Sequence, residues 1–211
     1  MNPFKLIAWV ATCLMVIFGL VGHGPNTYRY AIFFLGPFLW GIYFARQRLH
    51  LHPGHYAFFA AVLLFHDLGA FGAYGKFFFD LEFDTYVHFI FGVAGGLLVA
   101  RALRFALGLT GWKLCVGTVL LISGVGAIHE IMEFISTLIL GGEKGMLKLN
   151  DPDKFDTQKD LCNDLVGSLV AAVGYAIAAR SRSAVSKVMQ HKEGAASHQI
   201  EPDPLLAKSR L

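Results

Sequence analysis

The sequence predicts an all-α polytopic membrane protein, a six-helix transmembrane bundle with a polar pocket on its outer side. Of the 211 residues, 55% are hydrophobic and only 16% are charged, whereas soluble domains carry about 25% charged residues. Long apolar runs follow one another along the chain, and ionisable residues gather in a few places beside them. The net charge of +3 is small and no basic stripe alternates with aromatic residues, which argues against a nucleic-acid surface.

Six apolar segments approach the ~20 residues that a helix needs to cross ~30 Å of hydrocarbon. The second is short, and the fifth is long enough to tilt or to emerge beyond the lipid. Within the first segment, the apolar run over residues 6–21 is preceded by a single Lys5 and lacks a small-x-small cleavage site, which favours a retained span over a signal peptide. The predicted spans are residues 4–22, 30–45, 56–74, 85–107, 112–140 and 161–179.

The domain organisation that follows is a transmembrane domain over residues 1–180 and a flexible cytoplasmic tail over residues 181–211. The tail is rich in Ser, Lys, Gly and Pro and lacks a sustained hydrophobic period. The loop over residues 141–159, the longest between spans, is expected to form an ordered turn or a lid.

The distribution of Lys and Arg predicts that both termini lie in the cytoplasm. Cytoplasmic loops of membrane proteins carry the excess of basic residues. If the N-terminus is inside, the outside segments hold six of the 18 basic residues, and they share those loops with carboxylates. These six are Arg29, Lys76, Lys144, Lys148, Lys154 and Lys159.

Acidic residues and histidines converge at one depth of this topology. Twelve of the 15 Asp and Glu residues fall between Asp67 and Asp164. Ionisable groups at membrane depth are costly and usually functional. Four spans bring such groups to the outer half of the membrane: His66, Asp67, Asp84, His88, His129, Glu130, Glu133, Asp160, Asn163 and Asp164, with Asp156 and Gln158 just before the last span.

Helical spacing places many of these residues on common faces. Residues four apart lie one above the other on a helix. Three sets have this spacing: Asp84 with His88, His129 with Glu133, and Asp156 with Asp160 and Asp164, the last if its helix begins early. Small residues such as the Gly92–Gly96 pair allow close helix contact, so spans four, five and six are expected to form the core of the site.

A divalent-metal site is one chemistry that fits these residues. Carboxylates with imidazoles suit Zn, Mn or Fe, and an oxygen-rich set also suits Mg. The segment His129-Glu130-Ile131-Met132-Glu133 is similar to the zinc-protease H-E-x-x-H helix, but Glu replaces the second His, which argues against a protease. The expected ligands are Asp84, His88, His129, Glu130, Glu133, Asp160 and Asp164.

Three other interpretations stay open. In metal-free acid–base catalysis, crowded carboxylates share protons, and the catalytic residues would be His88, Glu130, Glu133 and Asp164. In ion or proton passage, the same groups bind and release a cation. In a purely structural role they pair with one another and with Lys144, Lys148 or Lys159. His66, Asp67, Asp156, Gln158 and Asn163 are expected in supporting positions in each case.

Two stretches carry a family resemblance. The pieces FDTYVHFIFGVAGGLLVARAL and HEIMEF…DPDKFDTQKDLCNDLVGSLVAAVG resemble the YjdF-type family of predicted bacterial inner-membrane proteins and, more distantly, VanZ-like membrane proteins. The likeness covers residues 58–180, and the D-T-Q-x-D run at Asp156–Asp160 carries the first resemblance. The acidic motif H-E-x-x-E departs from the VanZ pattern of Glu followed by Gln.

The resemblance implies a location and a class of substrate. VanZ-like proteins are associated with the cell envelope and antibiotic resistance, which implies a bacterial inner membrane and a lipid-linked substrate by analogy. The leading hypothesis is therefore an enzyme that hydrolyses or transfers a lipid or lipid-linked headgroup at a periplasm-facing site. The alternatives are an ion- or small-solute-binding transporter and a structural protein of the cell envelope.

Overall fold

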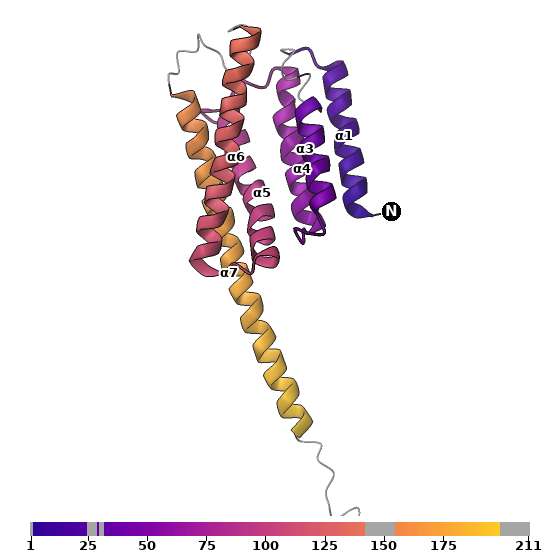
Figure 1. Cartoon of the computed structure of the whole chain (residues 1–211), viewed down its shortest axis with the longest axis vertical. Helices are drawn as coiled ribbons and strands as arrows, with labels where there is room; N and C mark the ends of the chain where they lie inside the picture. The colour runs from indigo at the N-terminus through magenta and orange to yellow at the C-terminus, as the bar shows by residue number, and fades with distance from the viewer. Residues whose placement is uncertain (1, 25–28, 30–31, 142–154, 199–211) are drawn as a thin grey trace, which may run out of the picture. The chain divides into compact units, whose positions relative to one another are not determined.

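The structure is a computed structural model that describes residues 2–24, 29, 32–141 and 155–198. Its helices are α1 (Pro3–Val21), α3 (Ile32–Ala45), α4 (Pro53–His66), the 3-10 helix η1 (Asp67–Phe71), α5 (Phe83–Ala106), α6 (Gly111–Leu140) and α7 (Asp156–His198). The strands β1 (Phe77–Phe78) and β2 (Leu81–Glu82) form an antiparallel hairpin. Two units are distinguished, residues 1–175 and 176–211, and the helices of the first run side by side (Figure 1).

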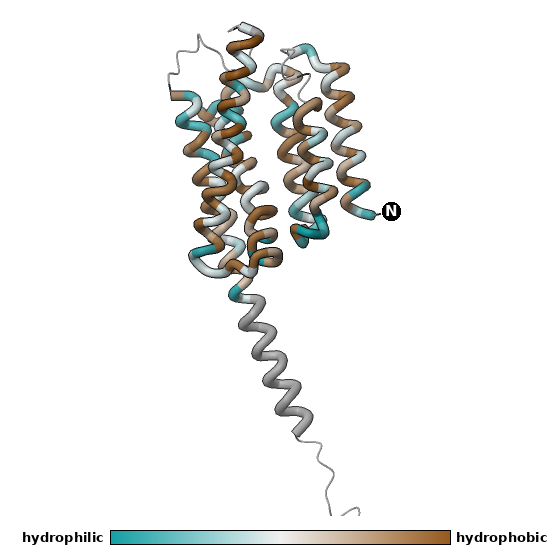
Figure 2. The backbone as a smooth tube through the Cα atoms, in the orientation of Figure 1, coloured by the Kyte–Doolittle hydropathy of each residue, from teal (hydrophilic) through white to brown (hydrophobic). Residues whose placement is uncertain are grey.

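The predicted apolar helical bundle is confirmed. Among the described residues, five helical stretches are long and apolar enough to cross a membrane: Pro3–Val21, Pro53–Phe71, Phe83–Ala106, Gly111–Ile139 and Asp156–Ser181. The sixth helix, α3, has 14 described residues, or roughly 21 Å at 1.5 Å per residue, which is less than the hydrocarbon thickness. Hydrophobic positions dominate the helices, and hydrophilic ones gather towards their ends, as at the connection between α3 and α4 (Figure 2).

Local sequence explains where several helices begin. The Asn2 side chain accepts a hydrogen bond from the Phe4 amide at 3.0 Å, and Pro3 occupies the first turn, where its missing N–H is not needed. At α4 the His52 imidazole caps the Gly54 amide in the same way, followed again by a proline. These caps fix where α1 and α4 begin, and each proline lies in a first turn, where its missing N–H breaks no hydrogen bond within the helix.

Helices α1, α3 and α4 form an apolar core of their own. Met15, Leu39 and Tyr56 are completely buried there. The Tyr56 hydroxyl donates to the Leu39 carbonyl at 3.0 Å, and the Trp40 indole N–H donates to Thr12 Oγ1 at 3.0 Å. Buried polar groups on aromatic side chains thus find partners across helices, as an apolar surrounding requires.

Helices α5 and α7 approach each other through glycines. A Cβ atom at Gly92 would lie 2.5 Å from the Asp164 carbonyl oxygen and 3.1 Å from the Gly167 Cα. A Cβ atom at Gly167 would overlap the Phe89 carbonyl oxygen, and one at Gly96 would lie 2.7 Å from the Ala171 Cβ. The predicted role of small residues in bringing these spans together is therefore visible in the structure.

Several boundaries differ from the sequence expectation. The third span is α-helical only to His66 and then continues as η1, which ends at Phe71 and is followed by Gly72 with a positive φ of 76°. Helix α7 begins at Asp156, five residues before the expected 161, and its backbone is helical to His198, where a flexible tail from residue 181 was expected. The flexibility of that tail stays a prediction.

The hairpin of β1 and β2 was not predicted, and its turn residues Phe79 and Asp80 have φ values of 50° and 65°, the left-handed values of a two-residue hairpin turn. Residues 142–154, which include Lys144, Lys148, Lys154 and most of the expected lid, lie outside the described residues.

The glycine contact between α5 and α7 generates a stability prediction. We expect Gly167→Ala to lower the free energy of unfolding by about 1–3 kcal/mol, because its Cβ collides with backbone that cannot rotate away. Gly174→Ala on the same helix is the matched control, since a Cβ there meets nothing within 4 Å. Thermal unfolding of the detergent-purified protein measures both, and equal melting temperatures for the two variants would contradict the packing.

Candidate functional site

One imidazole occupies the centre of the acidic cluster. His88 Nε2 lies 3.5 Å from Asp84 Oδ1, 3.8 Å from Asp160 Oδ2 and 3.9 Å from Glu130 Oε1. These groups come from α5, α6 and α7, and the side chains of His88, Glu130 and Asp160 are no more than 6% exposed. The predicted convergence of ionisable side chains from separate helices is thus present around His88.

The second nitrogen of His88 has a different partner. Its Nδ1 lies 3.3 Å from Asp164 Oδ1, and the Asp164 side chain is 1% exposed. Asp164 is therefore placed to accept a hydrogen bond from Nδ1, while Nε2 faces Asp84, Glu130 and Asp160. Asp164 thus faces the other nitrogen of the imidazole from Asp84, Glu130 and Asp160, and its place among the metal ligands stays a prediction.

A glycine on α6 makes room for Asp164. A Cβ atom at Gly126 would overlap Asp164 Oδ2 and would lie 3.1 Å from its Cγ. At Gly124, two residues earlier on the same helix, a Cβ would meet nothing within 4 Å. Gly126 thus acts as part of the site, and only its surroundings in three dimensions distinguish it from the other glycines of this helix.

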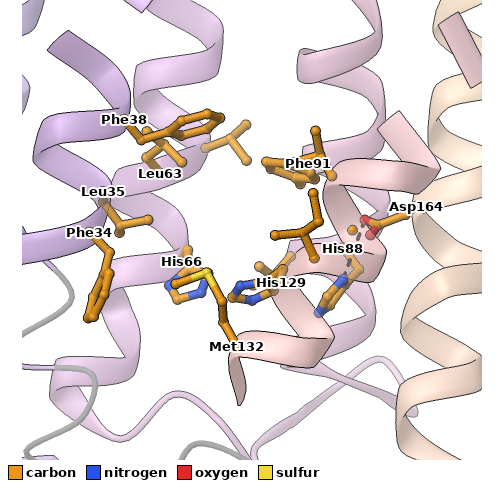
Figure 3. A pocket seen from close by; sticks show the side chains of 15 residues that line it. Phe34, Leu35, Phe38, Leu63, His66, His88, Phe91, His129, Met132 and Asp164 are labelled. Atoms are coloured by element: carbon orange, nitrogen blue, oxygen red, sulfur yellow. Dashed lines mark ion pairs between the residues drawn. The ribbon is translucent and has the colours of Figure 1, made fainter. Parts of the chain in front are cut away.

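A histidine–glutamate pair lies next to the central cluster. His129 Nε2 lies 3.3 Å from Glu133 Oε1, as the spacing of four residues predicted. The His129 ring centroid is 5.9 Å from that of His88 and 5.7 Å from that of His66. The three imidazoles form a row along one side of a cavity, with Asp164 beyond His88 (Figure 3).

The site lies between two hollows of different character. Towards α3 and α4, the rings of His66, His88 and His129 border a cavity with mainly apolar walls. On the other side, Asp84 and Asp160 border a polar hollow beneath the hairpin, which Asp156, Lys159 and Asn163 also line. The cluster is therefore in contact with an apolar and a polar compartment at once.

The supporting residues are spread around this arrangement. His66 contacts Tyr74 as well as His129, with ring centroids 5.6 Å apart. Asp67 is 1% exposed, and its two oxygens make no hydrogen bond within the described part of the chain. Asn163 lines the polar hollow, whereas Gln158 is an exposed residue. Asp67 and Gln158 are thus not drawn into the contacts around His88 that the structure describes.

The donor set fits a divalent cation. Donor atoms of one ion lie 2.0–2.6 Å from it, so they must lie within a few ångström of one another. One atom each from Asp84, His88 and Asp160 satisfies this, because all three lie within 4.8 Å of one another. The expected metal ligands His129 and Glu133 pair with each other beside this set and are not in it.

Comparison with known proteins places the chain in a family. A family model described as a predicted membrane protein, DUF2238, matches residues 4–181. The chain belongs to the DUF2238 family. No curated protein matches it, and no solved structure matches it. Membership in this family supports a membrane protein. It does not show that the chain is a YjdF-type or VanZ-like protein, the two groups that its sequence motifs resemble.

The matched region of the DUF2238 family covers every residue of the candidate site. Sequence reasoning found the ionisable residues because their spacing and depth are visible in the chain. It missed the role of Gly126 and the aromatic wall of the cavity, formed by residues such as Phe38 and Phe91. Apolar residues that line a cavity have the same composition as residues that face lipid, so no sequence signal separated them.

The contact between Gly126 and Asp164 can be tested with a double-mutant cycle. We expect Gly126→Ala to destabilise the protein, because the new methyl group displaces the Asp164 carboxylate from His88. In an Asp164→Ala background the same substitution should cost little, with a coupling energy of about 0.5–3 kcal/mol. Gly124→Ala is the control and should not couple. Additive effects of Gly126→Ala and Asp164→Ala would show that the two residues do not touch.

Proposed function

We propose that this DUF2238 protein is a membrane-embedded enzyme that uses a divalent metal ion to hydrolyse or transfer the headgroup of a lipid or lipid-linked substrate. The observation that carries the proposal is that the two ring nitrogens of His88 face different partners. One nitrogen faces three carboxylates and the other faces Asp164. Such a carboxylate–histidine pair behind a donor set is the arrangement that orients metal-ligating imidazoles.

The residues that would hold the ion are Asp84, His88 and Asp160. Glu130 also lies close to His88 Nε2. Nitrogen with carboxylate oxygen suits Zn, Mn or Fe, and Mg is compatible with the oxygens. When bound, such an ion polarises a phosphoryl or carbonyl oxygen and lowers the pKa of a coordinated water. Its positive charge also offsets the negative charge of the cluster, which a low-dielectric surrounding makes costly.

The adjacent pair His129–Glu133 supplies acid–base chemistry. His129 borders the apolar cavity, and its Nε2 lies 3.3 Å from Glu133 Oε1, which is within reach of a hydrogen bond. Glu133 orients the imidazole, which can then accept a proton from a nucleophile or donate one to a leaving group. This assignment keeps the predicted catalytic role of Glu133, and it gives Glu130 to the metal set rather than to proton transfer.

The packing beyond the site favours an enzyme over a through-pore. On the side of His88 away from the hairpin, α5 and α7 are in glycine-mediated contact at Gly92, Gly96 and Gly167. A transport path through that contact would have to separate the two helices. The close contact therefore supports a pocket between the helices rather than a path between α5 and α7.

The membrane and orientation complete the proposal. We place the protein in a bacterial inner membrane with both termini in the cytoplasm, on the basis of the Lys and Arg distribution and the YjdF-type and VanZ-like resemblance. The site then faces the periplasm. The substrate would reach it from the outer leaflet.

Metal binding is the first test. The full-length protein, purified in detergent and dialysed against Mn²⁺ or Zn²⁺, should retain about one ion per chain, as expected from the donor set of Asp84, His88 and Asp160. His88→Ala should abolish retention, and Asp164→Asn should weaken affinity by about 10–100-fold through the imidazole. Asp80→Asn is the matched control, since it removes one exposed carboxylate from the hairpin turn. Absence of bound ion in the unaltered protein would reject the proposal.

The acid–base pair is tested separately. We expect Glu133→Gln and His129→Ala to leave metal content unchanged, because neither side chain belongs to the donor set. Turnover of a bacterial lipid extract, followed by mass spectrometry of released headgroups, should fall by about 10²–10⁴-fold. Loss of metal together with turnover in both variants would place the pair among the ligands instead.

A further inference from the structure

The apolar cavity beside the candidate site has a volume of about 270 Å³. Its walls come from α3, α4, α5 and α6, and include Phe34, Phe38, Leu63, Phe91, Val125 and Ile128. Its polar end is the row of His66, His129 and His88, with Asp164 behind it (Figure 3). The cavity is therefore amphipathic: one end is hydrocarbon-like and the other carries imidazoles.

The cavity is open on the side where α3 and α6 face outward. Four of its lining side chains are exposed: Phe34 is 61% exposed, Ile128 59%, Phe38 42% and Met132 41%. All four are apolar and belong to apolar helices of a membrane protein. The medium at this opening is consequently the hydrocarbon of the bilayer and its lipid chains.

From this placement we infer that the cavity binds one acyl chain of a membrane phospholipid. The chain enters sideways between α3 and α6, and its headgroup lies against the imidazole row. This inference rests on the proposed function and names its substrate class as a phospholipid taken directly from the bilayer. The apolar chain occupies the hydrocarbon-like end, and the phosphate-bearing end reaches the donor set around His88.

Size and chemistry support an acyl chain as the occupant. An apolar protein cavity of about 150 Å³ already binds benzene and stays dry. The present cavity is larger, and its inner wall is formed by Leu63, which is 3% exposed, and by Phe91. Ordered water needs two to four polar partners, and these are found only at the histidine end of the cavity.

A photoreactive lipid tests the inference. The full-length protein is reconstituted into vesicles of phosphatidylethanolamine and phosphatidylglycerol, with a trace of phosphatidylglycerol that carries a diazirine midway along one acyl chain. After illumination, the labelled residues are mapped by peptide mass spectrometry. We expect label on the inner wall, at Leu63 and Phe91, in addition to lipid-exposed positions such as Leu120 and Leu138.

A matched pair of substitutions separates a bound chain from surrounding lipid. Ile128 lines the cavity and Ile131 does not belong to its lining; both lie on α6, and their exposed fractions are 59% and 56%. Ile128→Trp should reduce label at Leu63 and Phe91 by about tenfold, the loss expected when two methylene groups are excluded. Ile131→Trp should leave it unchanged. Val125→Phe and Leu121→Phe form a second pair if a tryptophan prevents folding.

The outcomes distinguish this inference from the proposed function. Label confined to Leu120 and Leu138, equal effects of the two tryptophan variants, or cross-linking of two copies through this face would overturn the acyl-chain site. Metal retention is measured on the same samples. Retained Mn²⁺ without label at the inner wall would reject the chain site alone, and label without Mn²⁺ would reject the metal-dependent enzyme alone.

Discussion

The site around His88 is governed by one electrostatic constraint: several carboxylates gather in a low-dielectric surrounding, and their negative charge must be compensated. Four carboxylates from three helices lie within 4 Å of the nitrogens of a single imidazole. Taking such charges out of water costs several kcal/mol per ion, and their mutual repulsion adds to that cost. One histidine offsets at most one of them. A cation or shared protons must accompany the rest, which is why the cluster indicates a binding site more than a structural clamp.

The helix packing serves that arrangement. Glycines at positions 92 and 167 let α5 and α7 approach backbone to backbone, and Gly126 leaves space for the Asp164 side chain. A methyl group at Gly126 would overlap the Asp164 carboxylate, and one at Gly92 or Gly167 would collide with backbone of the facing helix. These glycines therefore help to set the geometry of the charges around His88.

The sequence could predict the apolar helical bundle and most of the ionisable residues that gather around His88, because membrane depth and a spacing of four residues can be recognised from the sequence alone. His88 with Asp84, and His129 with Glu133, are examples of pairs that this spacing predicted correctly. The sequence could not rank the carboxylates by role. Asp160 and Asp164 lie on the same helical stripe, yet one faces Nε2 and the other Nδ1, which depends on the rotation of α7 against α5. It could not separate cavity-lining from lipid-facing aromatics either, since both are apolar.

The most direct measurement of the central claim is an experimental density map of the full-length protein in a lipid environment with Mn²⁺ present. We predict a metal peak among Asp84, His88, Glu130 and Asp160, with Asp164 against the far nitrogen of the imidazole. Carboxylates directed into separate surroundings, with no ion between them, would contradict it.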